Sequence, residues 1–420
     1  MAIVRPFAAI RPRPELAQRV AALPYDVMDV AEARELAAGN EVSFLHVSRP
    51  EIDLAPQVDP HADEVYERGR QNLDHFLTHG TLNQDAAPTF SVYRQRMGDH
   101  VQTGIVGIAA VDDYECGVIA KHELTRPEKE LDRVKHISAL EAQDEPVFLL
   151  SPRNAAVQAV IGEVTAAAPE IDIVTADGIG HTLWIISAAA PISRLQAAFA
   201  EIRRLYVADG HHRSAAAARV RELHRDDPAW RSAASFLVVI FAADELAVLP
   251  YHRAVADLAG LSPDELLAAL ASGFVLIKSD GPPNPSRRHV FGMYLAGQWY
   301  QLAARAELID ESDPVARLDV SILQDQILAP LLAVGNPRTD PRLLFVGGIR
   351  GTCELERLVD KGEAAVAFAL HPTSVGDLMA LADEGQLMPP KSTWFEPKLR
   401  SGLFLHSLRA AVDETEEPAR

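Results

Sequence analysis

The stretch YVADGHHRSAAA, residues 206–217, decides how the fold and the site are interpreted. Apolar residues lead into an Asp-Gly pair, two histidines and an arginine follow, and the chain then runs into alanines. The alanine-rich segment 211–226 predicts a helix, because alanine has the highest helix propensity. A helix that starts at His211 or His212 presents free main-chain N–H groups at its first turn, and such an end favours anions, phosphate above all.

The side chains of this stretch fit the same chemistry. Gly210 lets the main chain approach a ligand closely, Arg213 supplies a forked cation for phosphate oxygens, and the histidines are donors that can carry charge. We therefore assign Gly210, His211 and Arg213 to phosphate binding, and Asp209 and His212 to catalysis. Asp209 could hold a metal ion, orient a histidine or take a proton. The alternative is that Asp209 only caps the helix, which leaves Gly-His-His-Arg unexplained.

Size, charge and cysteine content exclude several classes of protein. The chain has 420 residues, enough for two or three domains, and 48% of them are hydrophobic. A formal net charge of −19 argues against a nucleic-acid partner. Two distant cysteines form neither a disulfide framework nor a zinc site. The most apolar stretch, 235–251, is interrupted by Asp244 and Glu245, so we expect two core strands there, no membrane partner and a cytoplasmic location.

Helical and strand patterns alternate along the chain, which predicts an α/β (α+β) fold with mixed sheets and flanking helices. We expect helices at 61–80 and 126–143, and strands at 42–47, 88–96, 100–111 and 146–152. We expect four segments: an N-terminal α/β domain at 1–117, a phosphate-binding domain at 118–228, a C-terminal α/β domain at 229–408 and an acidic tail at 409–420.

A second motif, KHELTRPEKELDRVKH, covers residues 121–136. Salt links at i,i+4 spacing on a solvated helix explain its charged residues after Pro127. They do not explain the His-Glu pair before that proline. On a strand end or loop, Glu123 could project into a cleft as a general base, and we assign it to catalysis. We assign His122, Thr125 and Arg133 to binding of the substrate.

A third motif, MPPKSTWFEPKLRSGL, covers residues 388–403. Two prolines precede Lys391, Ser392 and Thr393, which we assign to phosphate binding although the GxxxxGK[ST] pattern is absent. The alternative is that Lys391 and Lys398 are surface lysines.

Other chemistries are poorly supported, since the chain has neither a GxSxG nor an HExxH pattern. Adjacent histidines on a helix cannot easily face one ion, which makes a metallohydrolase built on His211 and His212 less favourable. Arg49, and the Tyr251-His252-Arg253 run after the apolar stretch, are interpreted as core or rim residues.

Several of these motifs together resemble one protein family. LPYDV (23–27), FLHVSRPEIDL (44–54), KHELT…DR, ADGHHR, LDVSIL (318–323) and MPPKSTWFEPKLRSGL resemble, in this order, the prokaryotic family called domain of unknown function 1015. Residues 118–220 are similar in layout to free-serine kinases of the ParB/sulfiredoxin-like fold, in which a His-Glu pair precedes a DGHHR motif. This implies a central ParB/sulfiredoxin-like unit embedded in a larger multi-lobed chain.

The second resemblance also implies roles for individual residues. Glu123 is then the base that acts on a serine hydroxyl, Gly210 to Arg213 cradle the donor phosphates, and Asp209 lies near the substrate or a metal. ParB proteins use a related motif to hold CTP. The chain is much longer than one such kinase domain, so the flanking segments could close the site or choose the donor.

The expected function is phosphoryl transfer to free L-serine, giving O-phospho-L-serine, with Mg²⁺ as the cofactor because donor phosphates normally travel with it. ATP, ADP, pyrophosphate and polyphosphate all remain open as donors, and the oligomeric state is also open. One alternative is a nucleotide-binding regulatory switch without phosphoryl transfer. Another is a phosphatase that acts on phosphoserine, with a histidine as the nucleophile.

Overall fold

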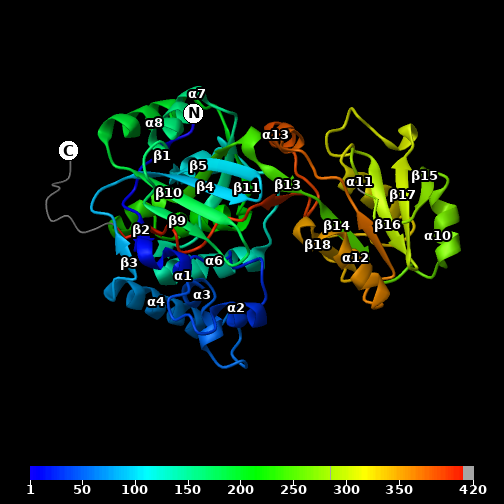
Figure 1. The fold of residues 1–420 in the computed structure, drawn as a ribbon, viewed down its shortest axis with the longest axis horizontal. Coiled ribbons are helices and arrows are strands. Elements are labelled where there is room, and N and C mark those ends of the chain that lie inside the picture. The colour runs from blue at the N-terminus through cyan, green and yellow to red at the C-terminus, as the bar shows by residue number, and fades with distance from the viewer. Residues whose placement is uncertain (284, 410–420) are drawn as a thin grey trace. The chain divides into compact units, whose positions relative to one another are not determined.

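A computed structural model describes residues 1–283 and 285–409 of the chain. Apart from Arg409, the acidic tail predicted at 409–420 lies outside these residues. The chain divides into two compact units, each with its own sheet (Figure 1). Unit 1 comprises Met1–Lys121, Thr125–Leu246 and Pro397–Arg420, and unit 2 comprises His122–Leu124 and Ala247–Glu396.

In the described part of unit 1, nine strands form one mixed sheet in the order β6-β11-β8-β12-β5-β4-β10-β9, with β1 paired to β5. The β6–β11 and β12–β8 pairs are parallel, and the others are antiparallel. The strands are β1 (Val4–Arg5), β4 (Phe90–Met97), β5 (His100–Ala110), β6 (Ile119–Ala120), β8 (Val147–Ser151), β9 (Ile171–Val174), β10 (Gly180–Ile186), β11 (Leu205–Asp209) and β12 (Ser235–Ala242).

Helices cover both sides of this sheet. In Figure 1, α7 and α8 lie above its strands, whereas α4 and α6 lie below them. The α-helices of unit 1 are α1 (Ala17–Val20), α2 (Val30–Ala37), α3 (Leu45–Ser48), α4 (Asp63–Thr78), α5 (Val111–Glu115), α6 (Pro127–Leu140), α7 (Ala155–Val164), α8 (Ala189–Glu201) and α9 (His211–Leu223). Its 3-10 helices are η1 (Pro14–Leu16), η2 (Pro50–Asp53), η3 (Pro228–Ala234) and η4 (Ala243–Glu245).

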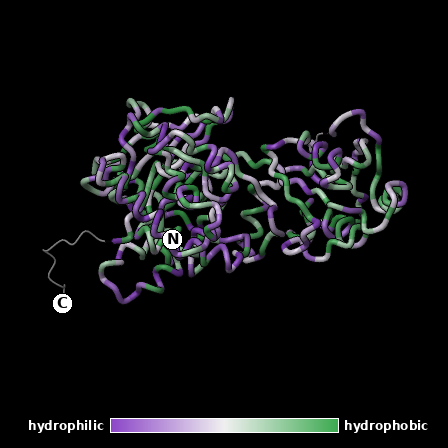
Figure 2. The backbone as a smooth tube through the Cα atoms, turned by 90° about the horizontal axis from the view of Figure 1, so that it is seen from below, coloured by the Kyte–Doolittle hydropathy of each residue, from purple (hydrophilic) through white to green (hydrophobic). Residues whose placement is uncertain are grey.

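Two small antiparallel pairs complete unit 1: β2 (Ile10–Pro12) with β3 (Leu82–Gln84), and β7 (Ala142–Gln143) with β21 (His406–Ser407). One core lies between the sheet and the helices α7 and α8. A second core joins the N-terminal helices to α4 and to Leu405. Figure 2 shows hydrophobic stretches of chain inside each unit and hydrophilic stretches mostly at the surfaces.

In the described part of unit 2, six antiparallel strands form a sheet in the order β15-β17-β16-β19-β14-β18. They are β14 (Tyr251–Val255), β15 (Phe274–Ser279), β16 (Val290–Leu295), β17 (Gln298–Ala304), β18 (Leu343–Gly347) and β19 (Val366–Ala369). A short pair joins β13 (Ala247–Leu249) to β20 (Trp394–Glu396). The helices are α10 (Pro263–Leu270), η5 (Ala306–Leu308), α11 (Asp319–Leu323), the π-helix η6 (Gln324–Leu328), η7 (Gly348–Arg350), α12 (Gly351–Asp360) and α13 (Val375–Asp383).

The predicted mixed α/β class is confirmed, as are most of the elements expected around the motifs. The helices expected at 61–80, 126–143 and 211–226 are α4, α6 and α9. The two strands expected at 88–96 and 100–111 pair with each other as β4 and β5. None of the helices within residues 1–283 and 285–409 combines the length and the apolar character needed to cross a bilayer.

The strand expected at 42–47 is wrong, because the chain forms the helix α3 there. Phe44, Leu45 and Val47 are all buried. A short apolar run that is enclosed by protein fits a helical turn as well as a strand, and its pattern alone cannot decide between them.

The apolar segment 235–251 does hold two strands, but they belong to different sheets. β12 lies between β5 and β8 in unit 1, and β13 pairs with β20 in unit 2. All eight residues of β12 are buried, as expected for a strand with neighbours on both sides. The 3-10 helix η4 separates the two strands.

The predicted domain boundaries at 117/118 and 228/229 both fall inside unit 1. The reason is the pairing of β12 with β5 along seven residue pairs, from Ser235↔Ala110 to Phe241↔Gly104. This pairing places strands of the first and third predicted domains side by side. The segment 118–228 contributes strands to the same sheet, and the two units therefore replace the three domains predicted from the sequence.

The C-terminal segment of unit 1 returns to its N-terminal layer at Gly402. This glycine has a φ of +82°, and a Cβ atom there would lie 2.6 Å from Phe44 Cγ. Ser401 exchanges main-chain hydrogen bonds with Ala22 at 3.2 and 3.0 Å, which fixes the register.

We predict that Gly402→Ala lowers the free energy of unfolding by about 2–5 kcal/mol, from the left-handed backbone and the overpacking together. Gly117→Ala is the matched control, since Gly117 has a φ of +81° and a Cβ atom there would have no neighbour within 4 Å. It should cost only about 1–2 kcal/mol. Urea unfolding followed by circular dichroism measures both. Equal losses in the two variants would contradict the packing explanation.

Candidate functional site

The candidate site begins where two parallel strands of unit 1 end. β6 and β11 pair in parallel through Ile119↔Leu205 and Ala120↔Tyr206. Because the carboxyl ends of parallel strands meet at the same edge of a sheet, the segments that follow them start close together. The first of these segments leads into the motif at 121–136, and the second into the Asp209–Arg213 turn. The pairing explains why two motifs far apart in the sequence start from the same edge of the sheet.

The turn between β11 and α9 depends on Gly210, which has a φ of +97° and a ψ of 30°. A Cβ atom at this position would lie 3.1 Å from Arg213 Cζ, so a side chain meets both backbone strain and a guanidinium. α9 begins at His211, as predicted. Ser214 closes its first turn, because its N–H and its hydroxyl donate to the Gly210 carbonyl at 2.9 and 3.2 Å.

Asp209 is held by cations of unit 1. Lys398 Nζ donates to Asp209 Oδ2 at 2.9 Å, and Arg213 Nη2 lies 3.7 Å from Oδ1. The Gly210 N–H also donates to Oδ1, at 2.8 Å. Burial by itself raises the pKa of Asp209, but Lys398 and Arg213 outweigh it and hold that pKa far below its usual range. Asp209 is therefore a carboxylate at neutral pH.

The alternative of a surface lysine is wrong for Lys398. Its side chain is 12% exposed, and its ammonium group is bonded to Asp209. Lys391, in contrast, is exposed.

Arg213 is buried, and its guanidinium contacts protein acceptors. Nη1 donates to the Pro146 carbonyl, and Nε lies 3.9 Å from Glu145 Oε2. Burial lowers the pKa of Arg213, but Asp209 and Glu145 raise it more, so the group stays charged. Direct contact between Arg213 and a phosphate stays a prediction.

His212 connects the first turn of α9 to the start of α6. Its Nε2 accepts a hydrogen bond of 3.1 Å from the main-chain N–H of Arg126, which is the N-cap residue of α6. A nitrogen that accepts an N–H carries no proton, so the neutral ring is protonated on Nδ1. The two helix starts are thus joined by an imidazole whose tautomer is fixed.

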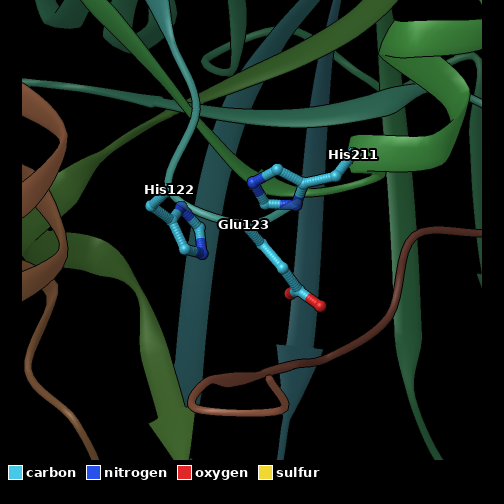
Figure 3. A group of neighbouring side chains, drawn as sticks. All are labelled: His122, Glu123 and His211. Atoms are coloured by element: carbon cyan, nitrogen blue, oxygen red, sulfur yellow. The ribbon is translucent and has the colours of Figure 1, made fainter. Parts of the chain in front are cut away.

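His122, Glu123 and His211 each offer one atom that could bind a metal ion (Figure 3). Two imidazoles and one carboxylate are a donor set that suits zinc and other transition metals. Mg²⁺ prefers oxygen ligands, and the Mg²⁺ expected to accompany the donor phosphates stays a prediction.

Thr125 and Arg133 make contacts within unit 1. Thr125 Oγ1 donates to Glu130 Oε2 at 2.9 Å. Arg133 is buried, donates twice to Asp132 Oδ2 at 3.0 and 2.8 Å, and lies 3.8 Å above the Tyr25 ring. Arg133 thereby anchors the LPYDV motif, and its predicted contact with a substrate stays a prediction.

Lys391, Ser392 and Thr393 belong to unit 2, where Arg253 shapes their loop. Arg253 is buried and donates to the carbonyls of Pro390 and Lys391 at 3.1 and 2.8 Å. Lys391 has a φ of +56°, which is unusual for a residue with a side chain. The Ser392 hydroxyl donates to the Pro389 carbonyl at 2.7 Å. The structure thus supplies a shaped loop, and its phosphate binding stays a prediction.

Sequence reasoning missed two carboxylates beside Arg213 and Arg133. Asp144 and Glu145 come directly before β8 and are both buried. Asp144 Oδ2 lies 2.9 Å from His136 Nε2, and His136 is itself buried. Two acidic residues directly before an apolar strand could have indicated buried carboxylates, and buried carboxylates need cationic or hydrogen-bonding partners. The local sequence does not indicate which residues those partners are.

Three solved structures are distantly similar to this chain. A free serine kinase in complex with AMP shares 12% identity over 69% of this chain and 86% of that chain, with a TM-score of 0.34. SbnI with a C-terminal truncation, from Staphylococcus aureus, shares 12% over 70% and 85%, with a TM-score of 0.36. A conserved hypothetical protein from Pyrococcus furiosus shares 13% over 69% and 89%, with a TM-score of 0.33. At these identities and TM-scores, the function of the similar structures does not indicate the function of this chain.

None of the curated proteins matches the chain. The family model described as "Protein of unknown function (DUF1015)" matches residues 4–321, which is most of the sequence. The resemblance inferred from the ordered motifs is thereby confirmed, and the chain belongs to the DUF1015 family.

Proposed function

We propose that the protein transfers a phosphoryl group to the hydroxyl of a small alcohol, free L-serine in the first place, and so forms O-phospho-L-serine. The observation that supports this most is the parallel pairing of β6 with β11. It starts the Glu123 segment and the Asp209–Arg213 turn from one edge of the sheet. A carboxylate base and a helix start suited to anions are what such a transfer requires.

In the proposed reaction, the serine Oγ attacks the terminal phosphorus of the donor. The Oγ–P bond forms while the bond from that phosphorus to the donor's bridging oxygen breaks, and the bridging oxygen keeps the electron pair. The hydroxyl proton passes to a carboxylate oxygen of Glu123. Positioned positive groups lower the barrier of such a reaction more than covalent chemistry does.

The groups that would face the transferring phosphate are the main-chain N–H groups at the start of α9 and the imidazole of His212. His212 joins the starts of α9 and α6, because its Nε2 accepts from the main-chain N–H of Arg126. Asp209 fixes the turn, since its carboxylate binds both Lys398 and the Gly210 N–H. Mg²⁺ would accompany the donor phosphates, and we assign no step to it. The donor is ATP, ADP, pyrophosphate or polyphosphate, and we place the reaction in the cytoplasm.

We predict that Glu123→Gln lowers the rate of phosphoserine formation by about 10²–10⁴-fold, because the amide cannot accept the hydroxyl proton. The measurement is phosphorus NMR of the purified protein with Mg²⁺, L-serine and one donor per sample. Glu163→Gln is the matched control, since Glu163 forms an exposed ion pair with Arg194 at 2.6 Å on the far helices α7 and α8. It should retain the wild-type rate. Full activity of Glu123→Gln would contradict the assigned role.

A second candidate function is hydrolysis of a phosphoester, phosphoserine included, and the ligand types that His122, Glu123 and His211 offer favour it. These are side chains that a transition metal could bind, and such an ion supplies an activated water when it is bound. Donor loss without phosphoserine, together with zinc or manganese found in the purified protein, would favour hydrolysis over transfer. Bound nucleotide with no turnover in any sample would instead favour the regulatory switch.

We predict that Lys398→Met lowers the free energy of unfolding at pH 7 by about 1.5–3 kcal/mol, the usual value of a hydrogen bond to a charged group. The depressed pKa of Asp209 means that this stabilisation is present above the unfolded-state value of about 3.9 and fades as the pH falls toward the folded-state pKa. Urea unfolding at several pH values should therefore show the two proteins converging in acid.

The control for this test is Lys135→Met, which removes a more exposed ion pair with Asp63 at 2.9 Å. Its loss should be about 1 kcal/mol or less. A loss in Lys398→Met that stays constant down to the lowest pH would show that the ammonium group does not act through Asp209.

A further inference from the structure

One buried carboxylate that the proposed reaction does not use connects three motifs of unit 1. Glu145 is 6% exposed and lies in the segment before β8. Its Oε1 accepts from the Tyr25 N–H at 3.0 Å and from the Ser401 hydroxyl at 2.7 Å. Its Oε2 lies 3.9 Å from Arg213 Nε. The side chain thus contacts the LPYDV motif, the LRSGL end of the C-terminal motif and the DGHHR motif.

The guanidinium of Arg213 is enclosed on several sides. Glu145 approaches its Nε, the Pro146 carbonyl accepts from Nη1, and Asp209 lies 3.7 Å from Nη2. Arg213 in turn limits the Gly210 turn, where no Cβ fits without meeting the guanidinium. The guanidinium of Arg213 thus adjoins both Asp209 and Gly210, the residues of the turn from which α9 starts.

We propose that Glu145 is a positioning residue: it orients the Arg213 guanidinium and, through it, the Asp209–Gly210 turn that begins α9. This inference rests on the proposed function only where it concerns catalysis, since the orientation of Arg213 can be measured without any turnover.

The surroundings of Glu145 are charged and tightly packed. A cavity of about 10 Å³, near the smallest accessible space that can hold one water molecule, is lined by Arg133 from α6, by Asp144 and Glu145, and by Arg213 from α9. His136 of α6 is paired with Asp144. From the N-terminal segment, Tyr25 contacts Glu145, and Asp26 acts on it through its charge.

These neighbours set the direction in which the proton of Glu145 responds. Burial raises the pKa of Glu145 above its usual range, Arg213 opposes the rise, and the charge of Asp144 adds to it. As the pH falls through this raised pKa, Glu145 gains a proton and loses the charge that holds Arg213. A raised carboxyl pKa also means that the ionised form costs stability above that pKa. Replacing Glu145 by an uncharged isostere therefore need not destabilise the fold at neutral pH.

The test compares Glu145→Gln with the wild-type protein by NMR of the arginine Nε–Hε groups, with the Arg213 signal assigned through Arg213→Lys. In the wild type, this signal should shift with pH as Glu145 titrates. In Glu145→Gln the shift should be lost. Glu141→Gln is the matched control, because Glu141 also pairs with arginines, at 3.0 Å with Arg70 and 2.6 Å with Arg409, away from Arg213. It should keep the pH-dependent shift.

The catalytic readout is kcat and KM for the donor across pH. Glu145→Gln should lower kcat/KM by about 10- to 100-fold, because the buried ion pair that orients Arg213 is lost, and should remove the acidic limb of the profile. Glu145→Asp keeps the charge with a shorter reach and should retain part of the activity and the pH-dependent shift. If Glu145→Gln does not fold, Glu145→Asp still tests the positioning role.

Two outcomes separate this inference from the proposed function. An Arg213 signal with the same position and pH dependence in wild type and Glu145→Gln overturns the positioning role, whatever the activities are. If the wild type transfers phosphate to no acceptor, yet the Arg213 signal responds to Glu145 as expected, the proposed function fails and the positioning role stands.

Discussion

The structure of unit 1 depends on how it accommodates the buried guanidinium of Arg213. Taking a charged group out of water costs several kcal/mol unless carboxylates and hydrogen-bond acceptors replace the lost hydration. Asp209, Glu145 and the Pro146 carbonyl surround the group. Those acceptors are themselves buried or half-buried and need partners, which Lys398, Ser401 and the Tyr25 N–H supply. One buried charge therefore requires residues from both ends of unit 1.

This requirement explains why the N-terminal and C-terminal segments of the chain pack together. Ser401 pairs with Ala22, and Leu405 pairs with Ile10, so the last described segment forms main-chain bonds with the first. Arg49 fixes the loop that follows Ala22 by donating to the carbonyls of Tyr25 and Met28 at 2.5 and 2.9 Å. Motifs with no evident chemistry in the sequence are thus the supports of the Asp209–Arg213 turn.

Sequence patterns correctly predicted the elements whose conformation depends on neighbouring residues in the chain. The start of α9 at His211 follows from a glycine before an alanine-rich run, and the β4–β5 hairpin follows from two alternating segments around a glycine turn. The partners of Asp209 could not be predicted, because Lys398 lies 189 positions away and no period or spacing connects the two. The pairing of β12 with β5 is non-local in the same way, and for that reason the predicted domain boundaries failed.

In each unit, a buried arginine donates to main-chain carbonyls and shapes a loop or turn. Arg253 donates to the carbonyls of Tyr251, Pro390 and Lys391 and lies 4.5 Å from the Phe345 ring, so it holds a loop in which Lys391 has a positive φ. Arg213 likewise faces protein acceptors beside a turn in which Gly210 has a φ of +97°. Guanidinium groups satisfy several acceptors in a fixed plane, which suits them to shaping main chain. The anion-binding groups proposed for the Asp209–Arg213 turn are therefore its main-chain N–H donors, and the buried Arg213 shapes that turn.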